Sequence, residues 1–283
     1  MAVTNAPKLG ILAGGGAAPR QLIAACQALD RPFFVVCLEG HAEPDLAGAG
    51  VPHEVLPLGA FARLKELCER EKIEDIIMLG RVRRPSVAEL KPDWLTLKIL
   101  TKIGMNALGD DGLLRGVGKA LEDECGVRLV GVADVFADLL APEGTLTTVV
   151  PDELAQEDIR RAVEIASTLG RLDVGQAVIV QQGIILGVEA VEGTDALIER
   201  SLGVRRDGGG GVLVKIAKPQ QDNRFDLPTI GIDTVRHVHA AGLAGIAVEA
   251  GRSLILEREK TIEAADMLGV FIVGLPLNGA ENG

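Results

Sequence analysis

Short apolar runs alternate with amphipathic stretches along the first half of the chain. The run at residues 9–13 is followed by Pro19, a proline typical of a first helical turn, and then by a stretch with helical spacing. Strands and helices that alternate in this way predict an α/β domain with a parallel, Rossmann-like sheet and right-handed crossovers. The predicted strands are 9–13, 32–38, 75–80 and 127–130, and the predicted helices are 20–29, 60–72, 94–103 and 113–124.

The second half of the chain has a different pattern. Turn-forming residues fill 140–148, and a strongly helical stretch begins after Pro151. Apolar runs on either side of Gln182-Gly183 and of Gly251-Arg252 predict two β-hairpins. We therefore expect a Rossmann-like domain over residues 1–138, a short linker, and a mixed-sheet α+β domain over residues 145–283.

Composition restricts the classes of partner. The 283 residues carry a net charge of −11, and aromatic residues make up only 2%, with no tyrosine and a single tryptophan, Trp94. An acidic chain with few aromatic side chains is a poor candidate for nucleic-acid binding or for broad attraction to an anionic membrane. The helix predicted at 94–103 is amphipathic. We expect its apolar stripe to face the core, and contact of this stripe with lipid or acyl chains is the alternative.

The four cysteines and four histidines show no metal-ligand spacing. Buried thiols are expected, which is consistent with a reducing cytoplasm. No apolar run reaches the length of a bilayer span. The expectation is a cytoplasmic protein, and peripheral contact with the inner face of the inner membrane is left open.

Three consecutive glycines, Gly14, Gly15 and Gly16, follow the first predicted strand and precede a helix. Backbone N–H groups in such a turn can bind a phosphate. A dinucleotide fingerprint would need glycine or alanine where Pro19 stands, although Glu39 lies near the place of a ribose-binding acid. A tight turn without a ligand is the alternative.

The segment from Lys218 to Thr234 is dense in polar groups and contains two prolines, Pro219 and Pro228. Its carboxylates are hard oxygen ligands that suit Mg²⁺ or Mn²⁺, and its basic residues suit a phosphate. The composition indicates metal-assisted chemistry on a phosphorylated substrate, against the alternative of a solvated loop. The carboxylates are Asp222, Asp226 and Asp233, and the basic residues are Lys218 and Arg224.

Two further basic residues lie where phosphates are often bound. Arg81 follows the strand predicted at 75–80, at the carboxyl edge of the sheet. Arg115 lies one turn into the helix that follows Asp110-Asp111. One of these two aspartates is expected to cap the helix, and for the other a role as a metal ligand is left open. The glycine-rich loop at 208–211 is either a hinge beside the polar segment or a permissive surface loop.

Motifs spread over nearly the whole chain resemble those of the UDP-2,3-diacylglucosamine pyrophosphatases of the type that lacks metallophosphoesterase motifs. The matching runs are Leu9–Gly16, Gly80–Val82, Gly109–Arg115, Lys218–Asp222, Arg224–Gly231, Asp233–Thr234 and Glu249–Leu256. The resemblance implies an enzyme of lipid A biosynthesis that cleaves the diphosphate of a UDP-linked diacylated glucosamine into UMP and the acylated sugar 1-phosphate, lipid X.

For this reaction we expect a metal-positioned water in a cleft between the domains. Asp226 is assigned as the essential carboxylate, with Asp222 and Asp233 as further ligands of Mg²⁺ or Mn²⁺. The expected roles of the other residues are to position water or phosphate oxygens (Thr229, Gln220, Gln221) and to hold the substrate (Gly14, Gly15, Gly16, Arg81, Arg115, Lys218, Arg224).

Two other classes of function stay open. A dinucleotide-dependent oxidoreductase would use the glycine turn, and a non-catalytic carrier of nucleotides or lipid phosphates would use the basic residues without turnover. The sequence does not settle the oligomeric state, a homodimer included.

Overall fold

The structure is a computed structural model that describes residues 6–46, 50–83, 90, 92–103, 110–219, 222, 224 and 227–277. Contacts between residues divide the chain into two compact units. The first unit comprises residues 1–135 together with the segment 222–226, and the second comprises residues 136–221 and 227–283. The polar segment that the sequence highlights is therefore shared: its centre groups with the first unit, and its two ends group with the second.

The first unit contains a five-stranded parallel sheet in the order β3-β2-β1-β4-β5. Strand β1 is central, and its Ile11 lies opposite Val35 of β2 on one side and Ile77 of β4 on the other. The elements of this unit are β1 (Leu9–Ala13), α1 (Ala18–Ala28), β2 (Phe33–Leu38), β3 (His53–Leu56), α2 (Phe61–Glu71), β4 (Asp75–Leu79), α3 (Trp94–Ile103), α4 (Asp110–Cys125), β5 (Arg128–Leu129) and α5 (Val132–Val135).

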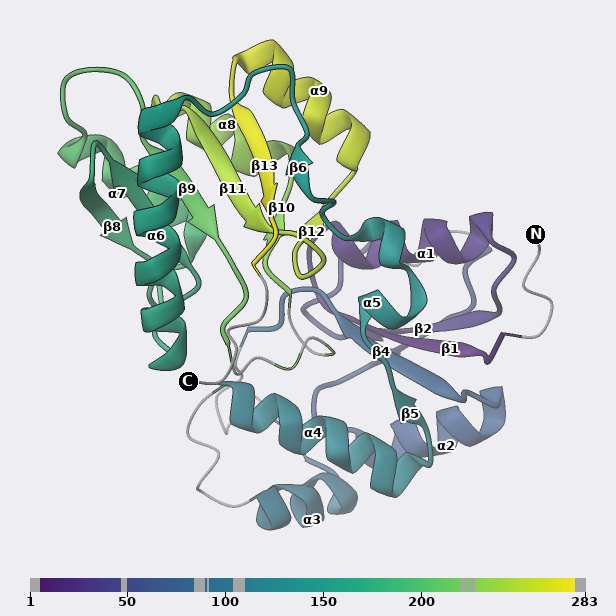
Figure 1. Ribbon diagram of the computed structural model, residues 1–283. Coiled ribbons are helices and arrows are strands. Elements are labelled where there is room, and N and C mark those ends of the chain that lie inside the picture. Colours follow the sequence, from purple (N-terminus) through teal and green to yellow (C-terminus); the bar gives the residue numbers. More distant parts are fainter. Residues whose placement is uncertain are drawn as a thin grey trace. The chain divides into compact units, whose positions relative to one another are not determined.

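This strand order is that of a doubly wound sheet, in which the chain runs outward from β1 in both directions. Helix α1 covers one face of the sheet, and α2 and α4 cover the other (Figure 1). The core under α2 and α4 joins Leu67 and Leu121 of these helices to strand residues such as Val36 and Ile76, all of them buried. The carboxyl ends of β1 and β4 form the point where the winding direction changes, which is where open α/β sheets usually bind ligands.

The second unit contains a six-stranded mixed sheet in the order β6-β13-β11-β9-β7-β8 and a two-stranded sheet of β10 and β12. Strands β9, β11 and β13 are parallel to one another, whereas β6, β7 and β8 add antiparallel pairs. The elements are a 3-10 turn (Ala137–Leu139), β6 (Gly144–Thr145), α6 (Glu153–Arg171), β7 (Ala177–Gln181), β8 (Ile184–Val188), α7 (Thr194–Ser201), a second 3-10 turn (Leu202–Val204), β9 (Val212–Lys215), β10 (Thr229–Ile230), α8 (Ile232–Ala240), β11 (Gly245–Glu249), β12 (Leu254–Ile255), α9 (Arg258–Leu268) and β13 (Phe271–Leu275).

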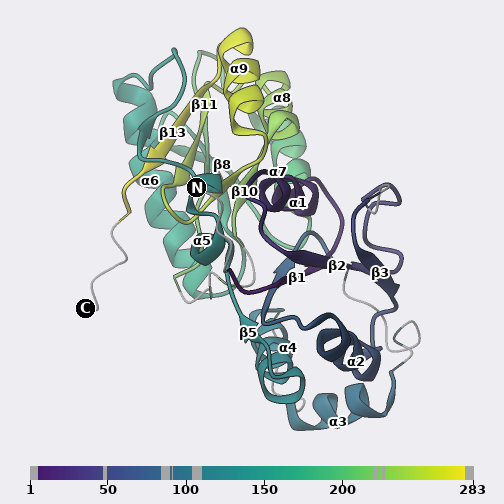
Figure 2. The same ribbon diagram turned by 90° about the vertical axis from the view of Figure 1, so that its right-hand side faces the viewer.

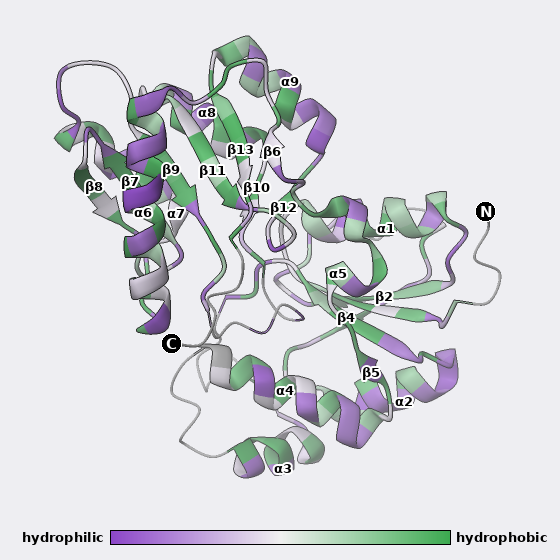
Figure 3. Ribbon diagram, in the orientation of Figure 1, coloured by the Kyte–Doolittle hydropathy of each residue, from purple (hydrophilic) through white to green (hydrophobic). Residues whose placement is uncertain are grey.

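Successive residues of these strands point to opposite faces of the sheet, and both faces are buried. In β9, Val212 and Val214 pack toward α6, whereas Leu213 packs toward α7, α8 and α9. Figure 2 shows β11 and β13 between α6 on one side and α8 and α9 on the other. The hydropathy colouring agrees, because β9, β11 and β13 are mostly hydrophobic while the outer side of α6 is hydrophilic (Figure 3).

The predicted fold class is confirmed: a parallel sheet in the N-terminal part and a mixed sheet in the C-terminal part. The hairpin around Gln182-Gly183 is also confirmed, as β7 and β8. The hairpin predicted around Gly251-Arg252 is wrong. Strand β11 pairs in parallel with β9 and β13, and β12 leaves this sheet to pair with β10.

Helix α3 has a mixed environment. Leu95 and Ile99 are buried, as expected for a core-facing stripe, but Trp94 and Leu97 are 68% and 52% exposed. No helix in the described part of the chain is long and apolar enough to cross a membrane. Contact of α3 with lipid was the alternative that the sequence left open, and it stays untested.

The turn between β7 and β8 is held by a buried carboxylate from α6. Asp158 is 2% exposed, and its two oxygens accept hydrogen bonds from the backbone N–H groups of Gln182 (2.9 Å) and Gly183 (2.7 Å). Both turn residues have positive φ angles, which a two-residue hairpin turn of this kind requires. Asp158 thus joins the long helix α6 to the antiparallel edge of the sheet.

We predict that Asp158→Ala lowers the free energy of unfolding by about 1–3 kcal/mol, because two backbone donors of an exposed turn lose their buried carboxylate acceptor. Urea unfolding followed by circular dichroism measures the change. The matched control is Glu157→Ala on the exposed side of α6, where only a loose ion pair with Arg160 is lost and the cost should stay below about 0.5 kcal/mol. Equal costs for the two variants would contradict the anchoring role of Asp158.

Candidate functional site

The glycine turn after β1 is held against the end of β4. The N–H of Gly14 donates to the carbonyl of Leu79 (2.8 Å), and Gly15 and Arg81 exchange two backbone hydrogen bonds of 2.9 Å each. A Cβ atom added at Gly14 would lie 2.6 Å from the carbonyl oxygen of Arg81. Close approach of two backbones therefore explains this glycine without a ligand.

Gly16 completes the turn with a φ of +90°, which favours glycine. Its N–H donates to the carboxylate of Glu43, at 3.3 Å. The N–H groups of all three glycines thus have acceptors inside the protein, and a carboxylate lies beside Gly16 where a phosphate was expected. The side chain of Arg81 is exposed at the same edge of the sheet.

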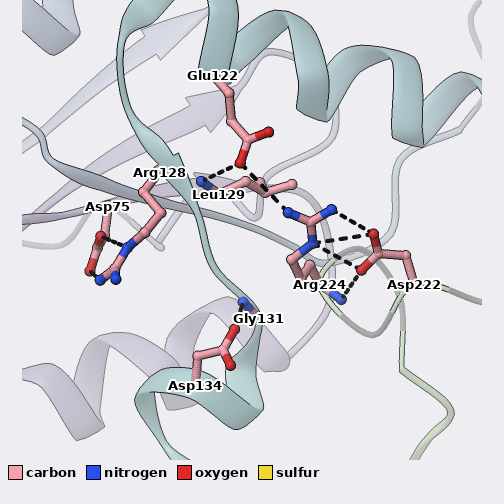
Figure 4. Close-up of polar contacts among 8 residues, drawn as sticks. All are labelled: Asp75, Glu122, Arg128, Leu129, Gly131, Asp134, Asp222 and Arg224. Atoms are coloured by element: carbon pink, nitrogen blue, oxygen red, sulfur yellow. Dashed lines mark hydrogen bonds and ion pairs between the residues drawn. The ribbon is translucent and has the colours of Figure 1, made fainter.

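A second group of charges surrounds Arg224. Its Nε and Nη2 donate to the carboxylate of Asp222 at 2.7–3.2 Å, and its backbone N–H donates to the same carboxylate at 3.1 Å. On its other side, Nη1 lies 3.6 Å from a carboxylate oxygen of Glu122 on α4. Figure 4 shows the guanidinium of Arg224 between these two carboxylates.

The ionisation of this group follows from these contacts. Hydrogen bonds from Arg224 hold the pKa of Asp222 below its usual value, and the positive charge of Arg115 acts in the same direction. The hydrogen bond to Asp222 in turn raises the pKa of Arg224, with smaller contributions from Glu122 and Asp134. Arg115 and Glu122 are seven residues apart on α4, so they lie on the same face of the helix. The structure thus associates three predicted site residues, Arg115, Asp222 and Arg224.

The two ends of the polar segment are fixed within the second unit. At the first end, Lys218 forms an ion pair with Asp173 just beyond α6, and the lysine side chain is only 16% exposed. At the other end, the hydroxyl of Thr229 donates to the carbonyl of Leu227 (2.9 Å), and Lys215 donates to the carbonyl of Thr229 (3.1 Å). These contacts give Lys218 and Thr229 structural partners.

Asp233 lies in the first turn of α8. Its side chain is 85% exposed and lies 3.4 Å from Arg236, one turn further along the helix. A carboxylate at this place also interacts favourably with the helix dipole. The structure therefore gives Asp233 an ordinary role at a helix start.

The remaining predicted residues lie outside the described residues: Gln220, Gln221 and Asp226, with the side chains of Asp110 and Asp111. Among the residues that are described, no three His, Cys, Asp or Glu side chains are grouped as a metal site. Both carboxylate oxygens of Asp222 are occupied by Arg224. The described donors alone do not make up a ligand set for a divalent cation, and the Mg²⁺ site stays a prediction.

Sequence reasoning missed several residues that support the site. Glu122 lies in an ordinary amphipathic helix, and nothing in its spacing reveals that Arg224 lies beside it. Glu249 is 3% exposed and accepts a hydrogen bond from the N–H of Ala217, directly before the polar segment. Only its place in the run Glu249–Leu256, which belongs to the family resemblance, offered an indication.

Comparison with known families defines the class of this two-unit α/β protein. The model of the LpxI N-terminal domain matches residues 8–139, and that of the LpxI C-terminal domain matches residues 142–273. The chain belongs to the LpxI family. It is 40% identical over 275 residues to UDP-2,3-diacylglucosamine pyrophosphatase LpxI of Caulobacter vibrioides, an alignment that covers 95% of this chain and 97% of that relative.

The lowered pKa of Asp222 predicts a pH-dependent contribution to stability. The stabilisation is present above the usual carboxyl pKa of 3.8 and is lost as the pH falls through the lower pKa of the folded state. We therefore expect Asp222→Asn to be less stable than the wild type at pH 7, with a difference that shrinks below about pH 3.8.

Urea unfolding at a series of pH values measures this difference. The control is Asp123→Asn, which changes an exposed carboxylate next to Glu122 on α4. A constant difference for Asp222→Asn would show that its ion pair with Arg224 does not stabilise the fold.

Proposed function

We propose that this protein hydrolyses the diphosphate bond of UDP-2,3-diacylglucosamine and releases UMP and 2,3-diacylglucosamine 1-phosphate. The observation that supports this most strongly is the 40% identity to a pyrophosphatase of this specificity along almost the full length of both chains. The polar segment at residues 218–234 supports it chemically, because hydrolysis of a phosphoanhydride needs positioning and neutralisation of charge more than covalent catalysis.

Arg224 is the described residue best suited to bind the diphosphate. A guanidinium can form two parallel hydrogen bonds to phosphate oxygens, as it does here to the carboxylate of Asp222. We propose that the diphosphate replaces Asp222 as the partner of Arg224. The exchange would release the Asp222 carboxylate next to the bound phosphates, where it can accept a proton from water or orient it.

Arg115 and Arg81 are proposed to provide further positive charge. Arg115 already acts electrostatically on Asp222, so its field extends to the position that a phosphate would take on exchange. Arg81 lies at the carboxyl edge of the parallel sheet. Binding of the diphosphate to both places, and the location of the site between the two domains, stay predictions.

Mg²⁺ or Mn²⁺ is part of the proposal as a cofactor. A divalent cation would neutralise charge on the diphosphate and lower the pKa of a bound water. The reason for proposing a divalent cation is Asp226, an acidic residue in the part of the polar segment that matches the family pattern. The described residues contribute no complete ligand set, so the roles proposed above for Arg224 and Asp222 do not depend on the cation.

The alternative of a dinucleotide-dependent oxidoreductase receives less support. Its pyrophosphate would need the N–H groups of the glycine turn, yet these bind Leu79, Arg81 and Glu43. A non-catalytic carrier is the stronger alternative, since it would use the same arginines. Release of product is what separates a carrier from a hydrolase.

The substrate carries two acyl chains, so an apolar surface must receive them. A cytoplasmic enzyme that meets the inner membrane peripherally is the proposed setting, with the exposed Trp94 and Leu97 of α3 as apolar candidates. The presence of one tryptophan and no tyrosine makes fluorescence of Trp94 a direct reporter of such contact.

We predict that the purified protein releases UMP from UDP-2,3-diacylglucosamine in Mg²⁺, and that a chelator removes most of the activity. Asp226→Asn should lower kcat by about 100-fold or more while the protein still binds the substrate, because a group needed for the chemical step is lost. Chromatographic measurement of UMP and of substrate binding follows both quantities.

The control variant is Asp123→Asn, which should behave as the wild type. Wild-type turnover by Asp226→Asn would remove Asp226 from the mechanism. Substrate binding without UMP release by the wild type would favour the carrier, and the absence of both binding and release would contradict the proposed substrate.

A further inference from the structure

Glu249 is a buried carboxylate at the carboxyl end of β11. Its side chain is 4% exposed, and its two oxygens have different partners. Oε2 accepts from the N–H of Ala217 at 3.0 Å, and Oε1 accepts from Nη1 of Arg252 at 3.0 Å. A buried charge costs free energy unless it is paired and hydrogen-bonded, and here both conditions are met.

The bond to Ala217 fixes the first end of the polar segment. Strand β9 ends at Lys215, and the N–H of Ile216 still donates to the carbonyl of Gln176. The next N–H, that of Ala217, is buried and would lose its partner as the chain leaves the sheet. Glu249 supplies the acceptor at this position, directly before Lys218.

The bond to Arg252 leads to the other end of the segment. Two residues after Arg252 the chain enters β12, which pairs with β10. The N–H groups of Leu254 and Leu256 donate to the carbonyls of Pro228 and Ile230, at 2.8 and 2.9 Å. Glu249 therefore holds, through Arg252, the turn that leads into β12. Strand β12 in turn pairs with β10, which contains the second end of the segment.

We propose that Glu249 is a positioning residue that fixes both ends of the polar segment and thereby sets the geometry of its functional groups. This inference rests on the proposed function for its effect on turnover. Its structural part stands independently, because Ala217, Arg252 and the pair β10 and β12 all lie in the second unit. Glu249 is not assigned a contact with the substrate.

Glu249→Gln is the discriminating variant. Glutamine has nearly the same size, but it offers one acceptor oxygen and an NH₂ group that donates. Ala217 and Arg252 bind different oxygens of Glu249, so a glutamine in the same position can accept from only one of them and one end of the segment loses its anchor.

Glu189 provides a matched control in the same unit. It is 6% exposed and accepts from the N–H of Gln176 (3.1 Å) and from the hydroxyl of Thr194 (2.6 Å). Glu189→Gln therefore also removes one acceptor from a buried, doubly bonded carboxylate, but its partners do not belong to the polar segment.

The experiment compares both variants with the wild type in thermal stability, in amide hydrogen exchange and in steady-state kinetics of UMP release. Both variants should lose similar stability. Only Glu249→Gln should show faster exchange at the end that loses its anchor, which is either Ala217 or Leu254 and Leu256, with kcat lowered by about 10-fold or more and KM changed by less than about 3-fold.

The outcomes distinguish a failure of the proposed function from a failure of the role inferred for Glu249. If the wild type releases no UMP, the proposed function fails, and the exchange comparison still decides whether Glu249 fixes the segment. Exchange or kcat in Glu249→Gln that equals those in Glu189→Gln would overturn the inference.

If Glu249→Gln does not fold, Arg252→Ala tests the second anchor alone. It should speed exchange at Leu254 and Leu256 and leave Ala217 protected by Glu249. Unchanged exchange at Leu254 and Leu256 would also overturn the inference.

Discussion

Backbone N–H groups that leave a sheet need an acceptor, and in this protein buried carboxylates supply it. Asp158 accepts two such groups at the β7–β8 turn, Glu189 accepts from Gln176, and Glu249 accepts from Ala217. Each carboxylate joins an edge or end of the mixed sheet to a neighbouring element. An unpaired N–H costs free energy comparable to a lost hydrogen bond where it is buried, as the N–H of Ala217 is. The position of the polar segment depends on the contact of Glu249 with Ala217.

The charged residues of the predicted site are largely compensated within the fold. Lys218 is paired with Asp173, and Arg224 lies between Asp222 and Glu122. A diphosphate that binds Arg224 must therefore compete with carboxylates already present. Such competition favours ligands with more than one negative charge, which is consistent with the proposed diphosphate substrate.

The sequence predicted the architecture well because the signals for it are local. Alternating apolar runs and helical spacing identified β1, α3 and the β7–β8 hairpin, since both faces of each sheet are buried in aliphatic side chains. The pairing of β12 with β10 was missed. Gly251-Arg252 has the composition of a hairpin turn, but the bond from Arg252 to Glu249 and the one from Leu254 to Pro228 direct the chain out of the sheet.

The candidate site was less predictable because its partners are distant in sequence. Composition indicated Arg224 and Asp222 but gave no means of finding Glu122 on α4. The glycine turn shows the opposite difficulty. Gly14 is required by the approach of Arg81, and this packing constraint produces the same pattern in the sequence as a phosphate-binding loop.

The contacts also distinguish the roles of the two basic residues in the polar segment. Lys218 is mostly buried, and its ammonium binds Asp173 at the end of α6, so its charge is committed to fixing one end of the segment. Arg224 is 40% exposed, and its planar guanidinium is held in a geometry in which a phosphate can take the place of the Asp222 carboxylate. The greater exposure of Arg224 and its exchangeable partner therefore favour Arg224 over Lys218 for the proposed contact with the diphosphate. Lys218 then belongs with Glu249 and Lys215, which hold the ends of the segment in place.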